Sequence, residues 1–539
     1  MSHYHARGIY FNQNPGILID SGPISAKVLF LECIFHPFHD HRGAPVGKKF
    51  ILSLDLGTTG NRVFCFDDTG FPLSNAYKEF TQHFPKPGWV EHDAEEIWTS
   101  ICELIPEAIR NGGLDAKDAI CLGITNQRET TVIWNKDTGK PVYNAIVWQC
   151  RRTTGICNKL KEDGHEALFR EKTGLVLDAY FSGTKIKWIL DNVPDARDLA
   201  KNGKLLFGTI DTWILWKLTG GRSHKTDHTN ASRTLIFNIA EKRWDRELIH
   251  ILDIPLNILP EVRDSASYFG ETVGVPGLPD GVTIGGIAGD QQAAMVGQNC
   301  VFEGTIKNTY GTGCFMLLNT GDNFILSKNG LLTTLTCDTQ GKPVYAFEGS
   351  VFIGGAVVQW LRDYMKFFEK SSDVDGLAES VSKDDEVVLI PAFVGLGAPY
   401  WKMDARGAIF GLTRDTTREQ IVRAALRSVA FQAMDVINVM QQDSGKIIHE
   451  LKVDGGATRG RYLMQFQADI LNIPVLLPEV TESTALGAAY LAGLSQRLYN
   501  SIEEVAKHNR IVQKYAPRIT DSERQRYIAI WKDAVNRLL

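Results

Sequence analysis

The stretch Phe50-Ile-Leu-Ser-Leu-Asp-Leu-Gly-Thr-Thr-Gly60 joins an apolar run to a turn rich in glycine and threonine. A second apolar run, Arg62 to Phe66, follows at once and ends in the turn Asp67-Asp-Thr-Gly70. This order predicts a β-hairpin. The glycines at its tip allow close approach, so the backbone N–H groups and threonine hydroxyls there can cradle a phosphate.

Asp55 stands at the end of the first predicted strand, beside this turn. A carboxylate in that position can hold Mg²⁺, directly or through water, as phosphoryl transfer requires. A tight hairpin turn capped by an aspartate is the structural alternative for the same residues.

A related layout recurs past the middle of the chain. Gly304-Thr-Ile-Lys-Asn-Thr-Tyr-Gly-Thr-Gly313 leads into the apolar run Cys314 to Leu318. Leu451-Lys-Val-Asp-Gly-Gly456 then predicts a strand that ends in a diglycine, before a helix from Tyr462 to Leu471. Two phosphate-turn hairpins, one in each half, predict a duplicated α/β domain with a nucleotide between the halves.

Strands and helices alternate between these hairpins. Ala94 to Asn111 has acidic residues in its first turn and predicts a helix. The predicted buried strands are Ala119 to Thr125, Phe207 to Asp211 and Val282 to Ala288. Such alternation indicates an α/β architecture with mixed sheets. We expect an extension over residues 1–47, an N-terminal domain over 48–297 and a C-terminal domain over 298–539.

Composition excludes several classes of protein. The net charge of −5 lacks the basic surplus of a duplex-binding protein, so we expect no nucleic-acid partner. No apolar run reaches the roughly 18 residues of a membrane span, and we read no signal peptide. The nine cysteines are scattered and form no disulfide framework, which favours the cytoplasm.

Residues 1–47 are rich in His, Gly and Pro and show no clear period. Cys33, His36, His39 and His41 could form a metal site, but no defined turn accompanies them. A flexible extension is the simpler interpretation.

The three glycine turns together resemble the phosphate-1, phosphate-2 and adenosine elements of the actin, hexokinase and Hsp70 architecture. Tyr180 to Trp188 and Gly407 to Leu412 match the two signatures of the FGGY carbohydrate kinases. Within that family, four further segments resemble glycerol kinases: Lys86–Asp93, Gly123–Thr130, Ala145–Arg152 and Ile287–Gln292.

This resemblance implies two RNase-H-like (actin-type ATPase) domains, with mixed sheets flanked by helices and the active site in the interdomain cleft. It implies transfer of the γ-phosphoryl of ATP to a primary hydroxyl of glycerol, which gives sn-glycerol 3-phosphate and ADP. ATP and Mg²⁺ are the implied cofactors. A homodimer or homotetramer in the cytoplasm is the implied assembly.

The resemblance also assigns roles by position. Asp290 would be the general base, and Asp55 would hold the metal. The implied substrate-binding residues are Arg128, Glu129, Tyr180, Asp290, Gln291, Trp148 and Phe315. The implied nucleotide-binding residues are Thr58, Thr59, Gly60, Arg62, Thr312, Gly355, Gln359, Gly456 and Gly460.

The match fails at a few positions. Gly460 stands where relatives carry an asparagine that touches adenine, which puts the adenine affinity in doubt. Leu56 and Gly60 replace a common Gln and Ser of the first turn. The loop Gly277 to Gly281 lacks the arginine through which some bacterial members bind fructose 1,6-bisphosphate, so we expect no such inhibition.

Two other functions stay open. A kinase of another small polyol or sugar, such as dihydroxyacetone or a pentulose, would use the same fold, although the Arg128–Glu129 pair and the bulky Trp148 favour three carbons. An Hsp70- or actin-like ATPase would close on a partner and would lack a substrate base. ATP turnover that ignores every polyol would favour that second alternative.

Overall fold

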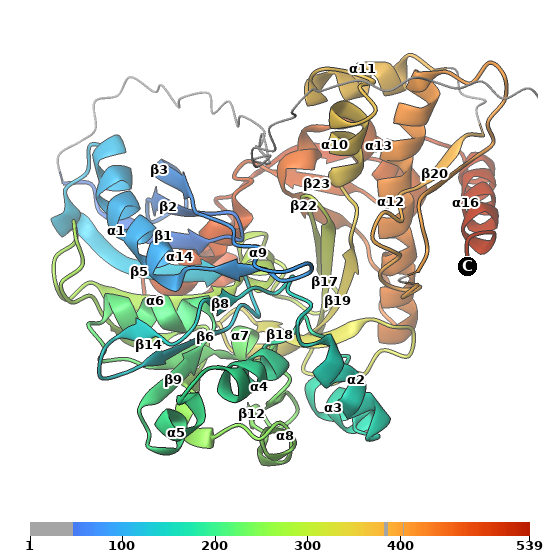
Figure 1. The fold of residues 1–539 in the computed structure, drawn as a ribbon. Helices are drawn as coiled ribbons and strands as arrows, with labels where there is room; N and C mark the ends of the chain where they lie inside the picture. Colours follow the sequence, from blue (N-terminus) through green and yellow to red (C-terminus); the bar gives the residue numbers. More distant parts are fainter. Residues whose placement is uncertain (1–46, 382–385, 403) are drawn as a thin grey trace, which may run out of the picture. The chain divides into compact units, whose positions relative to one another are not determined.

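The computed structural model describes residues 47–381, 386–402 and 404–539. The expected extension and its His/Cys group lie outside these residues, apart from Gly47. Two large mixed β-sheets with helices against them form the centre of the described part of the chain (Figure 1).

The first sheet has six strands in the order β14-β15-β5-β1-β2-β3. β1 and β2 form the predicted antiparallel hairpin, with Ile51 paired to Phe66, and β1, β5 and β15 are parallel. The bounds are β1 Phe50–Leu56, β2 Gly60–Phe66, β3 Pro72–Glu79, β5 Ala119–Asn126, β14 Ala266–Glu271 and β15 Thr283–Gly289.

The second sheet has seven strands in the order β18-β19-β17-β16-β22-β23-β24. Its hairpin β16–β17 is followed by the parallel neighbours β22 and β23, which repeats the arrangement β2-β1-β5-β15 of the first sheet. This repeat confirms the predicted duplication. The bounds are β16 Ile306–Tyr310, β17 Cys314–Gly321, β18 Leu332–Cys337, β19 Pro343–Val351, β22 Leu451–Asp454, β23 Val475–Pro478 and β24 Ile511–Tyr515.

Short strands complete the β-structure. They are β4 Glu91–His92, β6 Val132–Asn135, β7 Lys140–Pro141, β8 Ala145–Ile146, β9 Leu205–Gly208, β10 Lys225–Asp227, β11 Phe237–Asn238, β12 Arg243–Trp244, β13 Glu261–Arg263, β20 Val388–Ile390 and β21 Ala408–Phe410.

The helices run from α1 to α16. Their bounds are α1 Ala94–Asn111, α2 Thr154–Glu162, α3 Glu166–Thr173, α4 Ser182–Asn192, α5 Ala196–Lys201, α6 Ile210–Leu218, α7 His228–Ala231, α8 Arg246–Ile251, α9 Asp290–Gly297, α10 Ala356–Asp363, α11 Val374–Glu379, α12 Arg418–Ser444, α13 Arg461–Leu471, α14 Ser483–Ser495, α15 Ile502–Ala506 and α16 Asp521–Asn536.

Local sequence explains where α1 and α12 begin. The Asp93 side chain accepts the N–H groups of Glu95 and Glu96 and so caps α1. Thr417 and Gln420 form a capping box that starts α12. One prediction was wrong: the strand expected over Phe207 to Asp211 ends at Gly208, and Ile210 already begins α6.

Helix α14 comes late in the chain but packs against α9 and the first sheet. In Figure 1 its red-orange ribbon lies among the blue strands β1 and β5. Gly123 on β5 and Gly487 on α14 allow this contact, because a Cβ at either would collide with a carbonyl oxygen, of Ala488 or Ala293 respectively. The core of the first sheet therefore includes residues from both ends of the sequence.

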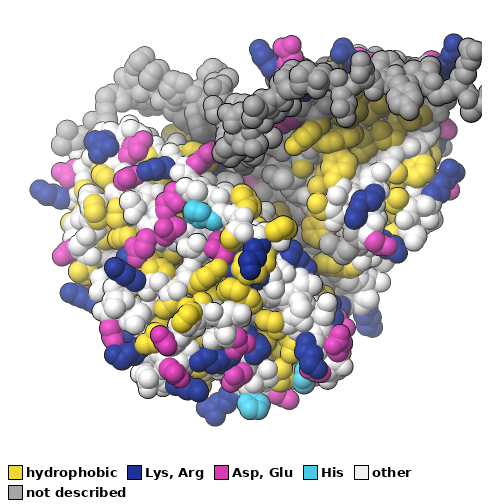
Figure 2. Space-filling model, viewed as in Figure 1, with side chains coloured by type: hydrophobic (Ala, Val, Ile, Leu, Met, Phe, Trp, Pro, Cys, Tyr) yellow, Lys and Arg dark blue, Asp and Glu magenta, His cyan; other side chains and the backbone are white. Residues whose placement is uncertain are grey.

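The surface and the helices agree with the composition. Figure 2 shows acidic and basic side chains intermixed over the face in view, in keeping with the net charge of −5. Among the described residues, no helix combines the length and apolar character needed to cross a membrane.

Candidate active site

Three parallel strands of the first sheet bring predicted site residues to one edge. Asp55 is the penultimate residue of β1, Arg128 closely follows β5, and Asp290 directly follows β15 and begins α9. Because β1, β5 and β15 are parallel neighbours, their carboxyl ends meet at the same edge. Ligands of open α/β sheets bind at this edge.

Asp290 is held in place but stays accessible. Arg128 Nε lies 3.1 Å from Asp290 Oδ1, and the backbone N–H of Gln291 donates to the same oxygen at 2.7 Å. The Arg128 side chain is 2% exposed, whereas that of Asp290 is 32% exposed. A charge-assisted contact thus orients a carboxylate that a bound molecule can still reach.

Arg128 belongs to a buried network of four charged side chains, together with Glu348, Arg233 and Glu129. Its two terminal nitrogens donate to Glu348 at 2.6 and 3.0 Å. Arg233 donates to Glu348 at 3.0 Å and, through Nε, to Glu129 at 2.6 Å. All four side chains are almost fully buried. Because Glu348 lies on β19, the network joins the two sheets.

The backbone at Glu129 is strained. Its φ of 63° lies in the left-handed region, which residues with a β-carbon rarely adopt. Two side chains of α4 hold this turn, since Ser182 Oγ and Lys185 Nζ donate to the Glu129 carbonyl oxygen at 3.0 and 3.2 Å. Strain that is held in this way is typical of functional sites.

Burial and neighbouring charges set the ionisation of the site. Burial raises the pKa of Glu348, but Arg128 and Arg233 outweigh it and lower the value to about 2. Burial raises the pKa of Asp55 to about 6, against the opposing effect of Arg62. Glu482 and Asp290 raise the Asp55 pKa further, so negative charge accumulates around this carboxyl group.

Lys307 on β16 is a buried cation beside the catalytic candidates. Its Nζ donates to Gln291 Oε1 at 2.5 Å and to Thr309 Oγ1 at 2.8 Å. Burial lowers its pKa to about 8, although Asp454 and Asp290 favour the charged form. Lys307 therefore connects the second sheet to the residue that follows Asp290.

The predicted aromatic walls are only partly brought together. The Trp148 and Tyr180 rings meet edge to face with centroids 5.5 Å apart. Trp148 Nε1 also donates to Thr58 Oγ1 at 3.0 Å, which ties this wall to the first turn. Phe315 lies on β17, and the described residues show no ring contact between it and Trp148.

The first predicted phosphate turn is tightly closed. Gly57 N–H donates to the Gly60 carbonyl at 3.1 Å. A Cβ at Gly60 would lie 2.7 Å from the Lys78 carbonyl oxygen, so a side chain there would require this backbone to shift. Thr58 and Thr59 form the tip between β1 and β2. Arg62 on β2 pairs with Glu482 at 2.9 Å and lies beside Asp55.

The second turn contacts the start of α10. Gly354 and Ala356 donate N–H groups to the Thr312 carbonyl at 2.8 and 3.1 Å. Gly355 precedes α10, and a Cβ there would lie 2.8 Å from the Gly311 carbonyl oxygen. Gln359 lies on α10, one turn after Gly355.

The third turn leads into α13. Gly455 has a φ of 91°, and a short 3₁₀-helix, Gly456–Arg459, follows it. Gly460 precedes α13 without a side-chain cap. The cap comes from Asp375 on α11, which accepts the N–H of Arg461 at 2.8 Å.

Asp55 is the carboxyl group that could share a metal ion with substrate phosphates. Within the described residues, no group of three or more His, Cys, Asp or Glu side chains lies close enough to hold a metal ion by itself. Mg²⁺ is often held by one or two carboxylates together with substrate phosphates. Asp55 and Asp290 could supply such carboxylates, because both stand at the same edge of the first sheet.

Three charged residues of the site were not predicted: Arg233, Glu348 and Lys307. Glu348 directly follows the apolar run Val344 to Phe347, and Lys307 follows Ile306 in another strand. A charge inside a buried strand requires a partner, which is the sequence signal that points to Glu348 and Lys307. Arg233 lies between α7 and β11 and gives no such signal.

A repeated sheet with a glycine–threonine hairpin in each copy, and an oriented carboxylate at a central strand end, define a nucleotide-dependent phosphotransferase. The chain belongs to the FGGY family of carbohydrate kinases. The N-terminal domain of that family matches residues 50–297 and the C-terminal domain matches residues 306–495.

Relatives cover nearly the whole chain. A glycerol kinase of Leptospira biflexa is 56% identical over 491 residues, which is 91% of this chain and 99% of the relative. One of Bacillus velezensis is 53% identical over 91% of this chain and 99% of its own length. The crystal structure of Plasmodium falciparum glycerol kinase with ADP has a TM-score of 0.86 at 37% identity, covering 91% of this chain and 98% of that one.

More distant structures share the fold. A ligand-bound xylulose kinase from Lactobacillus acidophilus has a TM-score of 0.82 at 22% identity, covering 91% of this chain and 98% of that chain.

Proposed function

We propose that this protein is a glycerol kinase that transfers the γ-phosphoryl of ATP to a primary hydroxyl of glycerol. The observation that carries the proposal is Asp290, a carboxylate oriented by Arg128 at the end of β15 and still 32% exposed. Glycerol as the substrate is supported by the glycerol kinases among its relatives, at 53–56% identity over nearly the full chain.

Asp290 acts as the general base. The glycerol oxygen attacks the γ-phosphorus, the bond from that phosphorus to the β,γ-bridging oxygen breaks, and ADP leaves. The hydroxyl proton passes to Asp290, whose carboxylate Arg128 keeps aimed at the acceptor. Proton transfer of this kind contributes roughly 10²–10⁴ in rate.

The substrate hydroxyls bind beside this base. Glu129 has one oxygen on Arg233, and its strained turn presents the carboxylate next to Arg128. Tyr180 and Trp148 form an aromatic wall, and we expect the bulk of these rings to favour a three-carbon chain over a larger sugar. Gln291 is held by Lys307, and Phe315 provides a second apolar side.

The nucleotide binds across the three turns. Thr58, Thr59, Gly60 and Arg62 would contact phosphate from the first hairpin, and Thr312, Gly355 and Gln359 from the second. Gly456 and Gly460 would lie under the adenosine. Asp55, with Asp290 near it, would hold Mg²⁺, which neutralises developing charge on the phosphates.

We further propose that the protein works in the cytoplasm as a homodimer or homotetramer. The eight cysteines of the described residues are all free, as in a reducing compartment. Analytical ultracentrifugation of the full chain measures the assembly directly.

A coupled assay of ADP release tests the function. We expect Mg-ATP turnover that depends on glycerol and falls at least 100-fold in Asp290→Asn. The control is Asp68→Asn, an exposed turn residue, which should leave turnover unchanged. Turnover with dihydroxyacetone or a pentulose but not with glycerol would assign a different substrate. Full activity of Asp290→Asn would refute the role of Asp290 as the general base.

A further inference from the structure

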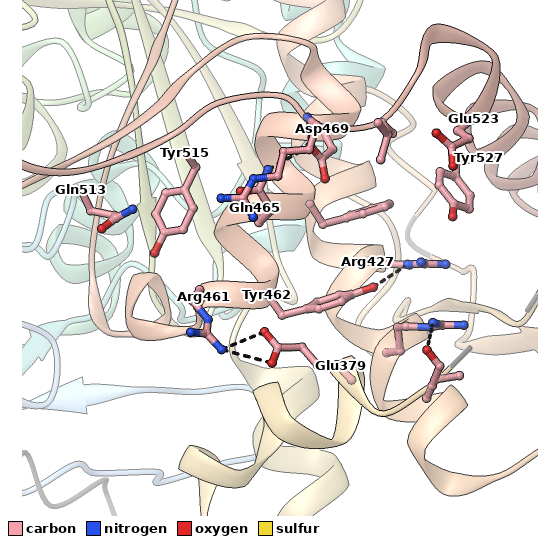
Figure 3. A pocket seen from close by; sticks show the side chains of 16 residues that line it. Glu379, Arg427, Arg461, Tyr462, Gln465, Asp469, Gln513, Tyr515, Glu523 and Tyr527 are labelled. Carbon is pink, nitrogen blue, oxygen red and sulfur yellow. Dashed lines mark hydrogen bonds and ion pairs between the residues drawn. The ribbon is translucent and has the colours of Figure 1, made fainter. Parts of the chain in front are cut away.

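A pocket lies in the C-terminal half, beside the start of α13, which directly follows the third nucleotide turn. Its volume is about 510 Å³, within the range of small-molecule sites. Residues from α11, α12, α13, β24 and α16 line it (Figure 3). None of the predicted ATP- or glycerol-binding residues is among them.

Arginines dominate the charge of this pocket. Arg423, Arg427, Arg461 and Arg518 line it, against the carboxylates of Glu379, Asp469 and Glu523. The four arginines come from α12, from α13 and from the segment between β24 and α16, so they surround the pocket from several sides.

The three carboxylates are already engaged. Glu379 accepts from Arg461 through both oxygens at 3.1 Å (Figure 3). Asp469 accepts the Arg518 backbone N–H at 2.7 Å, and burial raises its pKa. Glu523 accepts the backbone N–H of Thr520 at 2.9 Å and so helps to cap α16. Glu379 is thus committed to Arg461, and the pocket has one more arginine than it has carboxylates.

Arg427 and Arg518 remain open to an anion. Within the described residues, no salt bridge joins either guanidinium to a carboxylate, although the charge of Arg518 acts on Asp469. Arg427 is nevertheless held rigidly: its Nε donates to the Tyr462 hydroxyl at 2.9 Å. Its guanidinium also lies 5.0 Å from the Phe466 ring and 4.8 Å from the Tyr527 ring. Two arginines of this kind can bind a dianion.

The pocket also offers contacts for an organic body. The aromatic rings of Tyr462, Phe466 and Tyr527 line one side and form an apolar wall. Gln465 donates its amide to Asp469 at 3.0 Å, but its buried Oε1 has no hydrogen-bond partner. A buried acceptor without a donor costs free energy, which a ligand hydroxyl would recover.

We propose that this pocket binds a small phosphate monoester with a hydroxylated body, such as a sugar phosphate or a nucleoside monophosphate. Arg427 and Arg518 take the phosphate. Gln465 takes a hydroxyl, and the aromatic wall takes the carbon skeleton.

The pocket shares α13 with the nucleotide site. Asp375 accepts the N–H groups of Arg461 and Tyr462 at 2.8 and 3.2 Å, directly after Gly460. A phosphate that competes with Glu379 for Arg461 shifts the start of this helix. Binding in the pocket therefore changes the KM for ATP and leaves the KM for glycerol nearly unchanged, a coupling that is reciprocal.

Isothermal titration calorimetry on the full chain tests the site with ribose 5-phosphate, ribose and inorganic phosphate. Ribose 5-phosphate carries the group common to sugar phosphates and nucleoside monophosphates. We expect it to bind the wild type at least tenfold more tightly than either other probe. Arg427→Gln and Arg518→Gln should each weaken this binding at least tenfold. Because Arg518 is exposed, its substitution should not disturb folding, so a loss of binding in that variant reports on the site itself.

Arg510→Gln is the matched control, because Arg510 is exposed near β24 but does not line the pocket. It should bind as the wild type does. No binding to the wild type, equal binding to all four proteins, or equal affinity for inorganic phosphate would overturn the proposal. An effect of ribose 5-phosphate on the KM for ATP that survives in Arg518→Gln would assign that effect to the active site.

Discussion

The buried network predicts a large effect for Glu348→Gln. Glu348 is fully buried and accepts three hydrogen bonds from Arg128 and Arg233. The substitution keeps the shape of the side chain but removes its charge. It also places an amide N–H₂ group where only an acceptor fits, and it leaves Asp290 and Glu129 as the remaining charge partners of Arg128 and Arg233.

Two estimates of the stability lost in Glu348→Gln agree. The pKa of Glu348 is about 2 instead of 4.5, and a difference of that size corresponds to about 3 kcal/mol of stability near neutral pH. Removal of one partner from a buried ion pair costs roughly 3–5 kcal/mol. We therefore expect Glu348→Gln to lower the free energy of unfolding by about 3 kcal/mol. We also expect kcat to fall, because Arg128 no longer holds Asp290.

The pH dependence has a definite sign. Because the folded pKa of Glu348 is depressed, its contribution is fully present above about 4.5 and is lost as the pH falls towards 2. The wild type should lose stability over that window, and Glu348→Gln should lack this part of the slope.

Urea unfolding followed by tryptophan fluorescence, together with the ADP-release assay, measures both effects. Glu241→Gln is the control, because Glu241 forms an exposed pair with Arg243 whose loss costs about 0–1 kcal/mol. If Glu348→Gln stays within 1 kcal/mol of the wild type and keeps its kcat, the network does not hold Arg128 in the way described.

Two further substitutions test the site. Lys307→Met should lower kcat more than it raises the KM for glycerol, since Gln291 loses its partner. The wild type should also gain stability between pH 8 and 10.5, because the pKa of Lys307 is depressed in the folded state, and the variant should lack this gain. An unchanged kcat would contradict the role of Lys307. Lys452→Met, on β22, is the control. Gly460→Asn should lower the KM for ATP several-fold, because it restores the asparagine that touches adenine in relatives. The new Cβ would lie 3.3 Å from the nearest atom, the Ala457 carbonyl oxygen, and needs only a small shift. A raised KM would show that the turn rejects a side chain.

Much of the fold followed from local pattern. The two hairpins and the bounds of α1 were predicted because alternation, glycine turns and a capping aspartate act within a few residues. The boundary after Gly208 was missed, since the same short apolar run suits a strand or the start of α6.

The candidate site was predicted unevenly for a related reason. Asp290 and Arg128 stand in motifs beside strand ends, so their sequence context names them. Glu348 lies 220 residues from Arg128 in the chain, and only the arrangement of the two sheets makes them partners.

By itself, the sequence determined the duplicated hairpins and the family, and it named the candidate site residues. Those properties depend on short stretches whose backbone preferences are local. The tertiary structure alone decided that α14 packs on the first sheet, that four buried charges join the two sheets, and that four arginines line one pocket. Such contacts depend on which distant surfaces meet when apolar faces are buried, and no short pattern encodes that choice.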